Sequence, residues 1–318
     1  MSGSEPPRLP PFAVVVVSFA SSALLRRYAA RLSLPEGGRL VVVDCFSGDE
    51  ERARVRDLAA EHGWEAVLLD RNAGFGGGTN AGAARALELG SEVVVGLNPD
   101  AAIEPDSLER LVAAVAADPM LLASPIVVRG SGEPWFAGAD LYLDDGATRG
   151  AEARDRFPDA ARLPWATGAC FAMSAELWRR LDGFDEDYFL YWEDIDLSHR
   201  ALDAGARLGL VDALVVHDAG GTQGTAVADR AKSEEYYYWN IRNRMLYAVG
   251  HLDDEGVRRW LRSAPRAAWA VVLRGGRRQL VTSARPWRAL VRGLRDGARL
   301  ARERRPAAAR HRVPVGRP

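Results

Sequence analysis

The first third of the chain alternates runs of β-branched residues with segments of helical spacing. Continuous apolar runs are typical of strands buried on both faces, and they occupy residues 12–19, 39–44, 66–70 and 92–97. Helices are predicted between and after them at residues 24–32, 50–62, 79–89 and 105–117. Strands and helices that alternate at this spacing predict parallel βαβ units. The expected fold class is therefore α/β, with a mostly parallel central sheet and helices on both faces.

The carboxyl ends of these strands carry polar side chains. The first strand ends at Ser18, the second at Asp44, and the fourth runs into Asn98-Pro99-Asp100. Ligands bind at this edge of a parallel sheet, and such groups suit a nucleotide better than an apolar ligand. Asp100 offers a hard oxygen ligand of the kind that Mg²⁺ or Mn²⁺ prefers. A simple Asn-Pro-Asp turn is the alternative, and spacing alone favours it.

The third strand leads into a glycine-rich segment, GFGGGTN, at residues 74–80. It contains neither the GxGxxG of a dinucleotide site nor the Lys-Ser/Thr end of a Walker loop. A glycine-rich loop that opens a helix can present backbone N–H groups to phosphates or a base. It can equally be a tight turn, and the residues leave both interpretations open.

Residues 191–197, YWEDIDL, place three acids among aromatic and aliphatic side chains. Desolvation would raise the pKa of Glu193, Asp194 or Asp196 towards the range in which a carboxylate accepts and releases protons. The same acids could instead begin a helix that continues to residue 204, because negative charge complements a helix N-terminus. By itself the stretch favours this structural role over a general base.

Two further features follow. His217 ends an apolar segment that starts at residue 207, where a single histidine is more often a structural residue than a ligand. Residues 232–249 form an aromatic helical segment whose arginines, among them Arg244, could bind phosphate by bidentate contacts. A solvated basic face is the alternative for this helix.

Length and composition limit the number of domains that the chain can form. A chain of 318 residues with 47% hydrophobic residues is expected to form one large or two unequal units. Residues 130–163 are predicted to be a long loop or hairpin that shapes an acceptor pocket, and residues 165–173 a single strand. Cys45 and Cys170 have no metal-binding spacing, so free thiols in a reducing compartment are expected.

Residues 1–11 are polar and proline-rich, and we expect them to be disordered. They lack the pattern of a secretory signal, and no run of the chain approaches the ~18 apolar residues of a membrane span. A cytoplasmic location is therefore expected.

Charge is unevenly distributed. From Arg258 onward the chain has 18 arginines against two acids, a net charge of +16, whereas the preceding part carries −17. Apolar residues follow helical spacing in this basic part, at Trp287, Leu290, Val291 and Leu294. Such a helix can lie on an anionic surface at the inner face of the cell membrane. A packed helix and a disordered tail are the alternatives, residues 306–318 are expected to be disordered, and no motif supports nucleic-acid binding.

Six motifs occur in order along the chain. They are VVVDCFSGD at 41–49, RNAGFGGGTNAG at 71–82, LNPDAAIEPDSL at 97–108, ATGACFAMSAELW at 166–178, GFDEDYFLYWEDIDLSHR at 183–200 and VVHDAGG at 215–221. Together they resemble family 2 glycosyltransferases with the GT-A fold, especially bacterial rhamnosyltransferase-like members, over residues 12–249. The resemblance implies a Rossmann-like GT-A domain at residues 12–250 and a basic helical extension at 251–318. Within the domain, residues 12–104 would bind the nucleotide sugar and residues 105–250 the acceptor.

The resemblance also implies roles for individual residues. The donor nucleotide sugar would be bound by Ser18, Asp44, Asn72, Gly74, Phe75, Asn80, Asn98, Asp100 and Arg244. Mg²⁺ or Mn²⁺ is expected at Asp100 with His217. Asp194 matches the catalytic base, with Glu193 as its neighbour and positioner. The acceptor is expected to meet Trp165, Gly168, Ala169 and Trp192.

Two residues depart from the family pattern. Cys45 replaces the Asn usual after the nucleoside-binding Asp, which leaves the nucleotide open, and Asn98 stands where many members have the first Asp of the metal motif. The expected activity is inverting transfer of L-rhamnose from dTDP-L-rhamnose to a hydroxyl of a polysaccharide, glycolipid, lipid-linked glycan or other glycoconjugate of the cell wall. The attacking hydroxyl must lose its proton, which needs a base such as Asp194.

Three alternatives accompany this expectation. A hexosyltransferase that uses a UDP- or GDP-sugar would share the fold and the site. A nucleotidyltransferase would be expected to carry a glycine-rich, basic loop after the first strand, where this chain has Ser18-Phe19-Ala20-Ser21. A non-catalytic nucleotide-sugar-binding protein would not need the acids Asp100 and Asp194.

Overall fold

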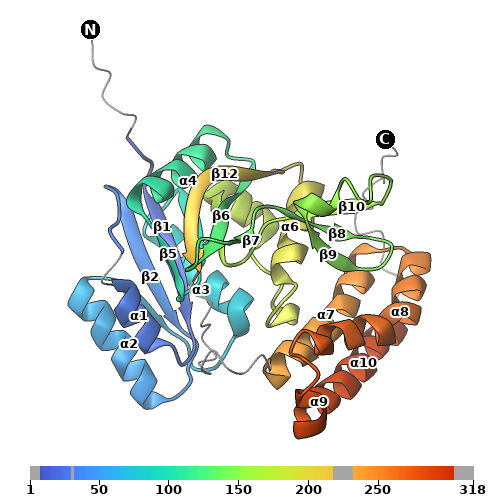
Figure 1. The fold of residues 1–318 in the computed structure, drawn as a ribbon. Coiled ribbons are helices and arrows are strands. Elements are labelled where there is room, and N and C mark those ends of the chain that lie inside the picture. Colours follow the sequence, from blue (N-terminus) through green and yellow to red (C-terminus); the bar gives the residue numbers. More distant parts are fainter. Residues whose placement is uncertain (1–7, 30–31, 218–231, 304–318) are drawn as a thin grey trace.

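The computed structural model describes residues 8–29, 32–217 and 232–303. Its first half is the predicted alternation of strands and helices (Figure 1). Four parallel strands lie in the order β3-β2-β1-β4. Their bounds are β1 Phe12–Ser18, β2 Gly38–Asp44, β3 Glu65–Leu68 and β4 Val93–Leu97, and the helices are α1 Ser22–Ala29, α2 Asp49–His62 and α3 Gly74–Glu88. The α/β fold class is confirmed.

The sheet continues past β4 with strands from later in the chain. β11 (Cys170–Ser174) lies antiparallel between β4 and β6 (Leu121–Arg129), and β12 (Arg207–His217) runs parallel to β6. Two short strands, β5 (Ala101–Ile103) beside β12 and β7 (Pro134–Phe136) beside β6, bring the sheet to nine strands. Because Cys170 pairs with Leu97, the segment before β11 reaches the carboxyl end of β4.

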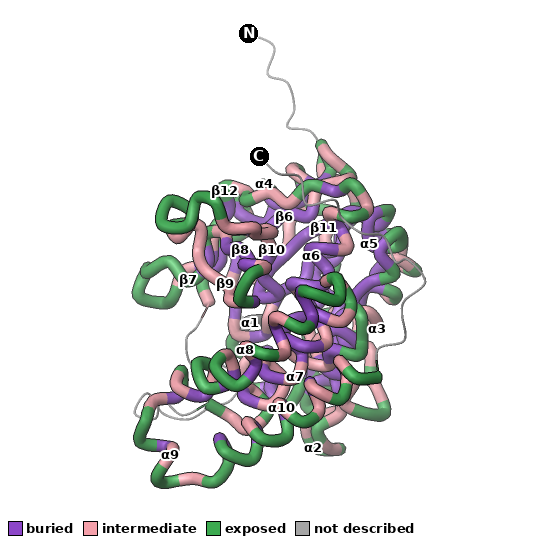
Figure 2. The backbone as a smooth tube through the Cα atoms, turned by 90° about the vertical axis from the view of Figure 1, so that its right-hand side faces the viewer, coloured by how far each residue is buried: buried purple, intermediate pink, exposed green. Residues whose placement is uncertain are grey.

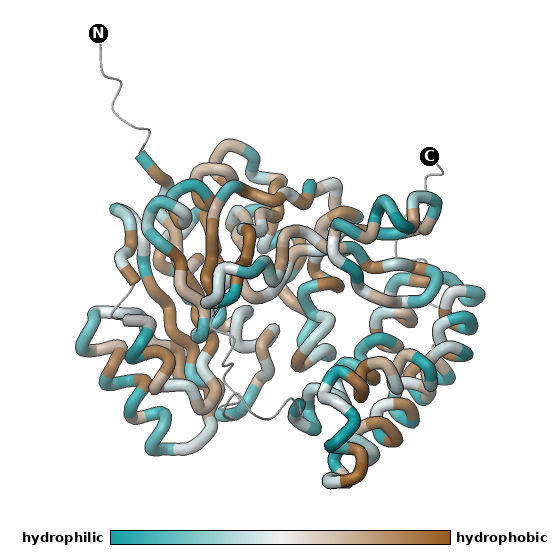
Figure 3. Tube along the Cα trace, viewed as in Figure 1, coloured by the Kyte–Doolittle hydropathy of each residue, from teal (hydrophilic) through white to brown (hydrophobic). Residues whose placement is uncertain are grey.

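Both faces of the central strands β1, β4 and β11 are buried, whereas β3 and β12 are partly exposed. Phe12, Val14 and Val16 of β1 pack with α1, α2 and α4 (Pro105–Ala117), and Ala13 and Val15 pack on the other face with α3, α5 (Ala175–Leu181) and α6 (Glu193–Asp203). The apolar strands of the sheet stand out in Figure 3.

Two predicted elements differ from the structure. Residues 130–163 were expected to be a long loop or hairpin. The strands β8 (Ala139–Tyr142) and β9 (Ala147–Gly150) do form a hairpin. The region differs from the prediction in also containing β7 and β10 (Arg162–Trp165), which completes a small antiparallel sheet of order β10-β8-β9. The short turn η1 (Ala151–Ala153) follows β9. The predicted single strand at 165–173 is wrong, because it breaks after Trp165 and resumes at Cys170.

The last quarter of the described chain is a layer of helices beside the small sheet (Figure 1). It consists of α7 Glu234–His251, α8 Asp254–Leu273, α9 Gln279–Thr282 and α10 Arg285–Glu303. α10 lies on α7 through small residues, since a Cβ at Gly293 would lie 2.9 Å from Cβ of Ile241 and one at Gly297 3.0 Å from Cγ of Met245. The expected helical extension is present, and α10 is a packed helix. The predicted disorder at residues 1–11 and 306–318 lies outside the described residues except at residues 8–11, where the carbonyl oxygen of Pro11 accepts from the N–H of Glu92 at 2.7 Å.

Candidate active site

The acids of the YWEDIDL segment lie in the first turn of α6, as the structural interpretation predicted. The chain reaches this turn through three non-glycine residues in the left-handed region, Phe189 (φ 58°), Tyr191 (φ 66°) and Trp192 (φ 77°). Such conformations cost about 1–3 kcal/mol each and persist only where surrounding contacts hold them. The buried Asn243 of α7 does so, because its amide donates to the carbonyl oxygens of Tyr188 (2.7 Å) and Tyr191 (2.8 Å).

Asp194 is partly buried, and both of its carboxylate oxygens accept a backbone hydrogen bond. Oδ1 accepts from the N–H of Ile195 at 2.9 Å, and Oδ2 accepts from the N–H of Gly168 at 3.0 Å. Desolvation raises the pKa of Asp194 from 3.8 to about 6, although both N–H groups act in the opposite direction. A carboxylate with this pKa is a better proton acceptor near neutral pH than an ordinary aspartate.

Glu193 is more deeply buried than Asp194. Desolvation, together with the charge of Asp194, raises the pKa of Glu193 well above its usual value. Its Oε2 has no hydrogen-bond partner within the described residues. Burial therefore favours the protonated form of Glu193 more strongly than that of Asp194.

The segment between β10 and β11, residues 166–169, lies across the start of α6. The N–H of Ala166 donates to Oγ of Ser198 at 3.0 Å, and that hydroxyl donates to the carbonyl oxygen of Asp194 at 2.6 Å. With the Gly168 bond, these contacts fix the segment against two turns of the helix. The N–H groups of Ala166 and Gly168 donate to side chains of α6 rather than to a neighbouring strand. The predicted strand therefore breaks at these residues.

Gly168 also brings α3 to the site. A Cβ at Gly168 would lie 3.3 Å from Cε1 of Phe75 and 3.6 Å from Oδ2 of Asp194. The Phe75 ring itself packs edge-on against Phe184, with ring centroids 5.7 Å apart. A predicted donor residue, Phe75, thus lies close to the predicted acceptor residue Gly168, beside Asp194.

A second pair of groups lies at the end of β4. Because His217 of β12 pairs with Ala101 of β5, its imidazole Nε2 lies 3.4 Å from Oδ1 of Asp100. The indole of Trp135 stacks on the imidazole, with ring centroids 5.0 Å apart. The N–H of Asn98 donates to the carbonyl oxygen of Ala169 at 3.0 Å, which ties this corner to the segment that contacts Asp194.

The donor set of this corner fits a divalent metal ion. One carboxylate and one imidazole, both largely buried, suit Mn²⁺ or Mg²⁺ when substrate oxygens and water complete the coordination. The described residues contain no group of three or more His, Cys, Asp and Glu side chains that could hold a metal by themselves. Asp100 and His217 could therefore hold a metal that shares its ligands with a bound diphosphate.

Ser18 and Asp44 are adjacent at the ends of β1 and β2, where the register pairs them. The Asp44 carboxylate is buried, and its Oδ2 accepts from Nε of Arg52 at 3.1 Å. Its Oδ1 has no hydrogen-bond partner within the described residues. A buried acceptor left unsatisfied is unfavourable, and a ligand N–H or O–H would satisfy it.

Other predicted donor residues use their polar groups inside the protein. Oδ1 of Asn72 accepts from the N–H of Gly74 at 2.9 Å. The side-chain amide of Asn80 pairs with the backbone of Phe184, accepting from its N–H at 2.8 Å and donating to its carbonyl oxygen at 2.9 Å. The structure thus gives Asn80 a role in holding α3 against the loop that precedes α6.

The glycine-rich segment is not a loop, because α3 begins at Gly74. Its glycines allow close packing, since a Cβ at Gly78 would lie 2.8 Å from Sγ of Cys45. Gly74 has φ 74°, and a Cβ there would overlap the carbonyl oxygen of Phe189. That oxygen accepts from the N–H of Phe75 at 2.9 Å, so the first N–H groups of α3 are used within the protein.

The structure does not bring Arg244 to these residues. Its buried guanidinium donates to the carbonyl oxygens of Trp260 (3.0 Å) and Asp145 (2.7 Å) in the helical layer and the β8–β9 turn. The indole of Trp192 packs in the same layer, 6.2 Å from the Trp260 ring. Trp165 ends β10, packs edge-on against Phe136 and leads into the segment that contacts Asp194.

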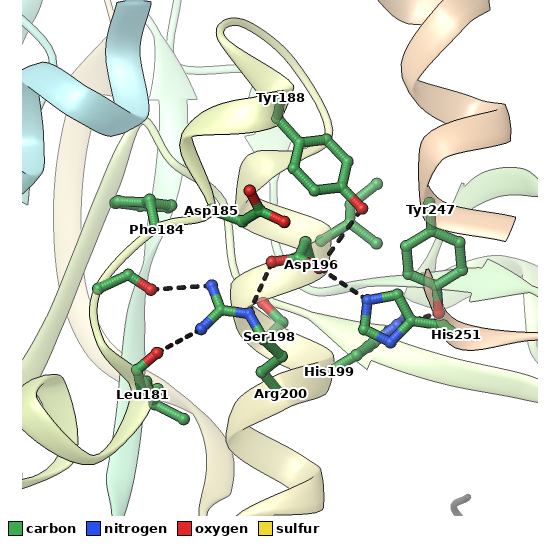
Figure 4. Close-up of polar contacts among 12 residues, drawn as sticks. Leu181, Phe184, Asp185, Tyr188, Asp196, Ser198, His199, Arg200, Tyr247 and His251 are labelled. Atoms are coloured by element: carbon green, nitrogen blue, oxygen red, sulfur yellow. Dashed lines mark hydrogen bonds and ion pairs between the residues drawn. The ribbon is translucent and has the colours of Figure 1, made fainter. Parts of the chain in front are cut away.

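Asp196 belongs to a separate buried network that sequence reasoning missed (Figure 4). Its Oδ2 accepts from Nε of Arg200 at 2.7 Å, and its Oδ1 lies 2.7 Å from Nε2 of His251 in α7. Burial by itself would raise the pKa of Asp196, but His251 and Arg200 outweigh it and lower that pKa. Arg200 also donates to the carbonyl oxygens of Leu181 and Gly183. The spacing of Asp196 and Arg200 along a helix signals their pairing, whereas nothing in the sequence signals His251.

The candidate site of this α/β fold thus combines polar strand ends, a partly buried aspartate at a helix start and an Asp/His corner. Residues 93–301 match the family described as Glycosyl transferase family group 2. The chain belongs to this family, and the expected family 2 resemblance is confirmed.

Two curated relatives agree with this assignment. A low-salt glycan biosynthesis hexosyltransferase of Haloferax volcanii is 24% identical over 73% of this chain and 74% of its own length. An N-acetylglucosaminyl-diphospho-decaprenol L-rhamnosyltransferase of Mycobacterium tuberculosis is 25% identical over 60% of this chain and 70% of its own length.

Solved structures confirm the GT-A fold. A mannosyltransferase from Pyrobaculum calidifontis in complex with GDP-Man and Mn²⁺ superposes with a TM-score of 0.52 at 18% identity, covering 93% of this chain and 88% of that one. GalNAc-T7 with UDP, GalNAc and Mn²⁺ gives a TM-score of 0.51 at 14% identity and covers 76% of this chain. This chain spans 50% of the length of the GalNAc-T7 chain.

Proposed function

We propose that this glycosyltransferase inverts the anomeric carbon as it moves L-rhamnose from dTDP-L-rhamnose to a hydroxyl of a glycan or lipid-linked acceptor, with Asp194 as the general base. The acceptor oxygen forms a bond to the anomeric carbon while the bond to the diphosphate oxygen breaks. The hydroxyl proton passes to the Asp194 carboxylate, and the nucleoside diphosphate leaves with the electron pair of the broken bond.

The observation that carries this proposal is the environment of Asp194. Its carboxylate is oriented by the N–H groups of Ile195 and Gly168 and borders the Phe75 ring. Its pKa of about 6 leaves it ionised at neutral pH, yet closer to the range of an effective base than a solvated aspartate. Burial raises the pKa of the neighbouring Glu193 well above its usual value, which disfavours a second negative charge beside Asp194.

The donor would lie along the strand ends. Ser18 and the unsatisfied Oδ1 of Asp44 would hold the nucleoside, and Asp100 with His217 would hold a divalent metal at the diphosphate. A bound Mg²⁺ or Mn²⁺ would supply positive charge where the leaving group becomes negative. Asn98 joins this corner to the acceptor segment through the 3.0 Å bond to Ala169.

The choice of sugar and acceptor rests on the relatives. The mycobacterial relative named as a rhamnosyltransferase supports L-rhamnose and a diphospho-lipid-linked acceptor. The archaeal relative named as a hexosyltransferase supports the alternative, transfer of a hexose from a UDP- or GDP-sugar.

A donor screen tests the proposal. The protein would be incubated with dTDP-L-rhamnose, UDP-glucose or GDP-mannose, each with Mg²⁺ or Mn²⁺ and N-acetylglucosaminyl-diphospho-decaprenol as the acceptor. We expect product with dTDP-L-rhamnose, of opposite anomeric configuration by NMR. Faster turnover with a UDP- or GDP-hexose would favour the alternative, and a product of retained configuration would exclude a single displacement with Asp194 as base.

A further inference from the structure

We propose that the outer tip of the helical layer docks on an anionic lipid bilayer. This tip, called the α9 surface below, consists of α9 with the adjoining ends of α8 and α10, which project from one end of the molecule (Figures 1 and 2). Its apolar residues are Trp269, Val281, Trp287 and Val291. The inference goes beyond the transfer reaction, because it rests on exposure and charge rather than on the active site.

The apolar residues of the α9 surface are exposed and adjacent. The exposed fractions are 87% for Val281, 62% for Val291, 44% for Trp287 and 39% for Trp269. The Trp269 and Trp287 rings lie 5.8 Å apart, and Nε1–H of Trp287 donates to the carbonyl oxygen of Leu280 at 3.0 Å. The two tryptophans of α8 and α10 thus lie side by side, and Trp287 contacts the residue that precedes Val281 in α9.

The conformation that exposes Val281 is held by a buried glutamine. Nε2 of Gln279 donates to the carbonyl oxygens of Val272 and Gly276, each at 3.0 Å, and its Oε1 accepts from the hydroxyl of Tyr237 at 2.7 Å. These three hydrogen bonds fix the turn that precedes Val281. An apolar side chain held outward in this way indicates a contact surface.

The segment of the chain that forms the patch carries only positively charged side chains. Residues 256–295 contain 11 arginines and no Asp or Glu. Arg288 and Arg292 pair with Glu234, at 3.1 and 3.6 Å. The exposed Arg266, Arg277, Arg278 and Arg285 have no ion pair within the part of the chain that the structure describes. Positive charge without a partner complements an anionic surface.

Arginines around exposed tryptophans fit a lipid surface better than a nucleic acid. Tryptophan is enriched at the membrane–water interface, where the ring contacts acyl chains while basic groups contact anionic headgroups. A backbone of phosphates offers no partner for Val281 and Val291. The described residues contain no helix long and apolar enough to cross a bilayer, so the contact we propose is with the surface alone.

The structure also shows that fewer residues of α10 can contact the bilayer than the sequence predicted. Sequence spacing placed Trp287, Leu290, Val291 and Leu294 on one apolar stripe, but Leu290 and Leu294 pack against the aromatic residues of α7. Of these four residues, only Trp287 and Val291 are exposed. The part of α10 that can contact the bilayer is therefore limited to these two side chains, beside α9.

Vesicle sedimentation with the full chain tests this proposal. The vesicles would be phosphatidylcholine alone or phosphatidylcholine with phosphatidylglycerol. The test variant is Arg277→Gln with Arg278→Gln, and the matched control is Arg179→Gln with Arg180→Gln, an exposed adjacent pair on α5. Each arginine near an anionic surface contributes enough for about a fivefold change in partitioning, so the test pair should reduce binding to anionic vesicles by roughly 30-fold.

The possible outcomes distinguish an anionic bilayer from a nucleic acid as the binding partner of the α9 surface. Binding to anionic but not neutral vesicles, weakened by the test pair and by Val281→Ser but not by the control pair, supports the proposal. Equal loss from the test and control pairs would overturn it, because it would reflect net charge alone. Binding of single-stranded DNA with no binding to anionic vesicles would also overturn it. Transfer to a water-soluble acceptor analogue should be unchanged in both double variants, so a failure here is distinct from failure of the proposed reaction.

Discussion

Replacement of Asp194 by asparagine should raise the stability of the fold while it removes activity. The folded-state pKa of Asp194 is about 6, above its ordinary 3.8, because burial disfavours the ionised form. For an acid whose pKa is raised on folding, stability is complete below pH 3.8 and is lost as the pH rises through about 6. The neutral amide of the variant would resemble the protonated acid, so Asp194→Asn avoids this loss.

The magnitude follows from the pKa shift. Raising the pKa from 3.8 to about 6 corresponds to about 3 kcal/mol at pH 7.5. An asparagine can accept from only one of the N–H groups of Ile195 and Gly168, and the lost hydrogen bond costs about 1 kcal/mol. We therefore expect Asp194→Asn to gain about 2 kcal/mol at pH 7.5 and no such gain near pH 3. Activity should fall by roughly 10²–10⁴-fold, the usual contribution of a general base.

Urea unfolding at pH 7.5 and at pH 3, together with turnover, provides the assay. Asp196→Asn is the matched comparison, because it makes the same change two residues away, where the carboxylate is paired with Arg200 and His251. That variant should lose about 3–5 kcal/mol. Its stabilisation is lost as the pH falls, since the pKa of Asp196 is lowered on folding. If Asp194→Asn were less stable than the parent at pH 7.5, or kept its activity, the environment assigned to Asp194 would be wrong.

Three further outcomes are expected. Glu193→Gln should keep turnover within a few-fold, since glutamine resembles the protonated acid; a loss as large as that of a general base would show that Glu193 ionises in the reaction. Gly74→Ala should destabilise the fold by about 2 kcal/mol more than Gly90→Ala by thermal unfolding, because both have positive φ but only the first would overlap a neighbour. EDTA should weaken donor binding in a thermal-shift assay, and Asp100→Asn or His217→Ala should remove this sensitivity; an unchanged response would exclude a metal at this corner.

Local patterns predicted the elements that depend on their own residues. β1, β2 and α4 follow directly from continuous apolar runs and from a proline at a helix start. Ser174 is of a residue type that favours helix N-caps, and its Oγ accepts from the N–H of Leu177 in α5 at 3.0 Å. These elements would have the same local structure in many folds, so their own residues are sufficient to predict them.

The parts that the sequence did not predict depend on contacts across long separations. The break at residues 166–169 exists because α6 accepts the hydrogen bonds of that segment. Asn80 was expected to meet the donor, yet its amide pairs with Phe184, 104 residues away. Asn243 and His251 gave no signal, because an ordinary helical residue becomes a buried partner only when α7 packs against α6.

The first turn of α6 shows why the acid motif could not be interpreted from its sequence. The positive end of a helix would lower the pKa of all three acids, but the structure shifts them in different directions. Glu193 has an unsatisfied oxygen and is raised most clearly, Asp194 has backbone N–H partners and reaches about 6, and Asp196 has two basic partners and is lowered. The hydrogen-bond and ion-pair partners of each acid, rather than its position in the helix, therefore determine the direction of its pKa shift. In this arrangement the ion pairs of Asp196 help to hold the helix start that keeps Asp194 desolvated, so one turn combines a stabilising acid with the proposed general base.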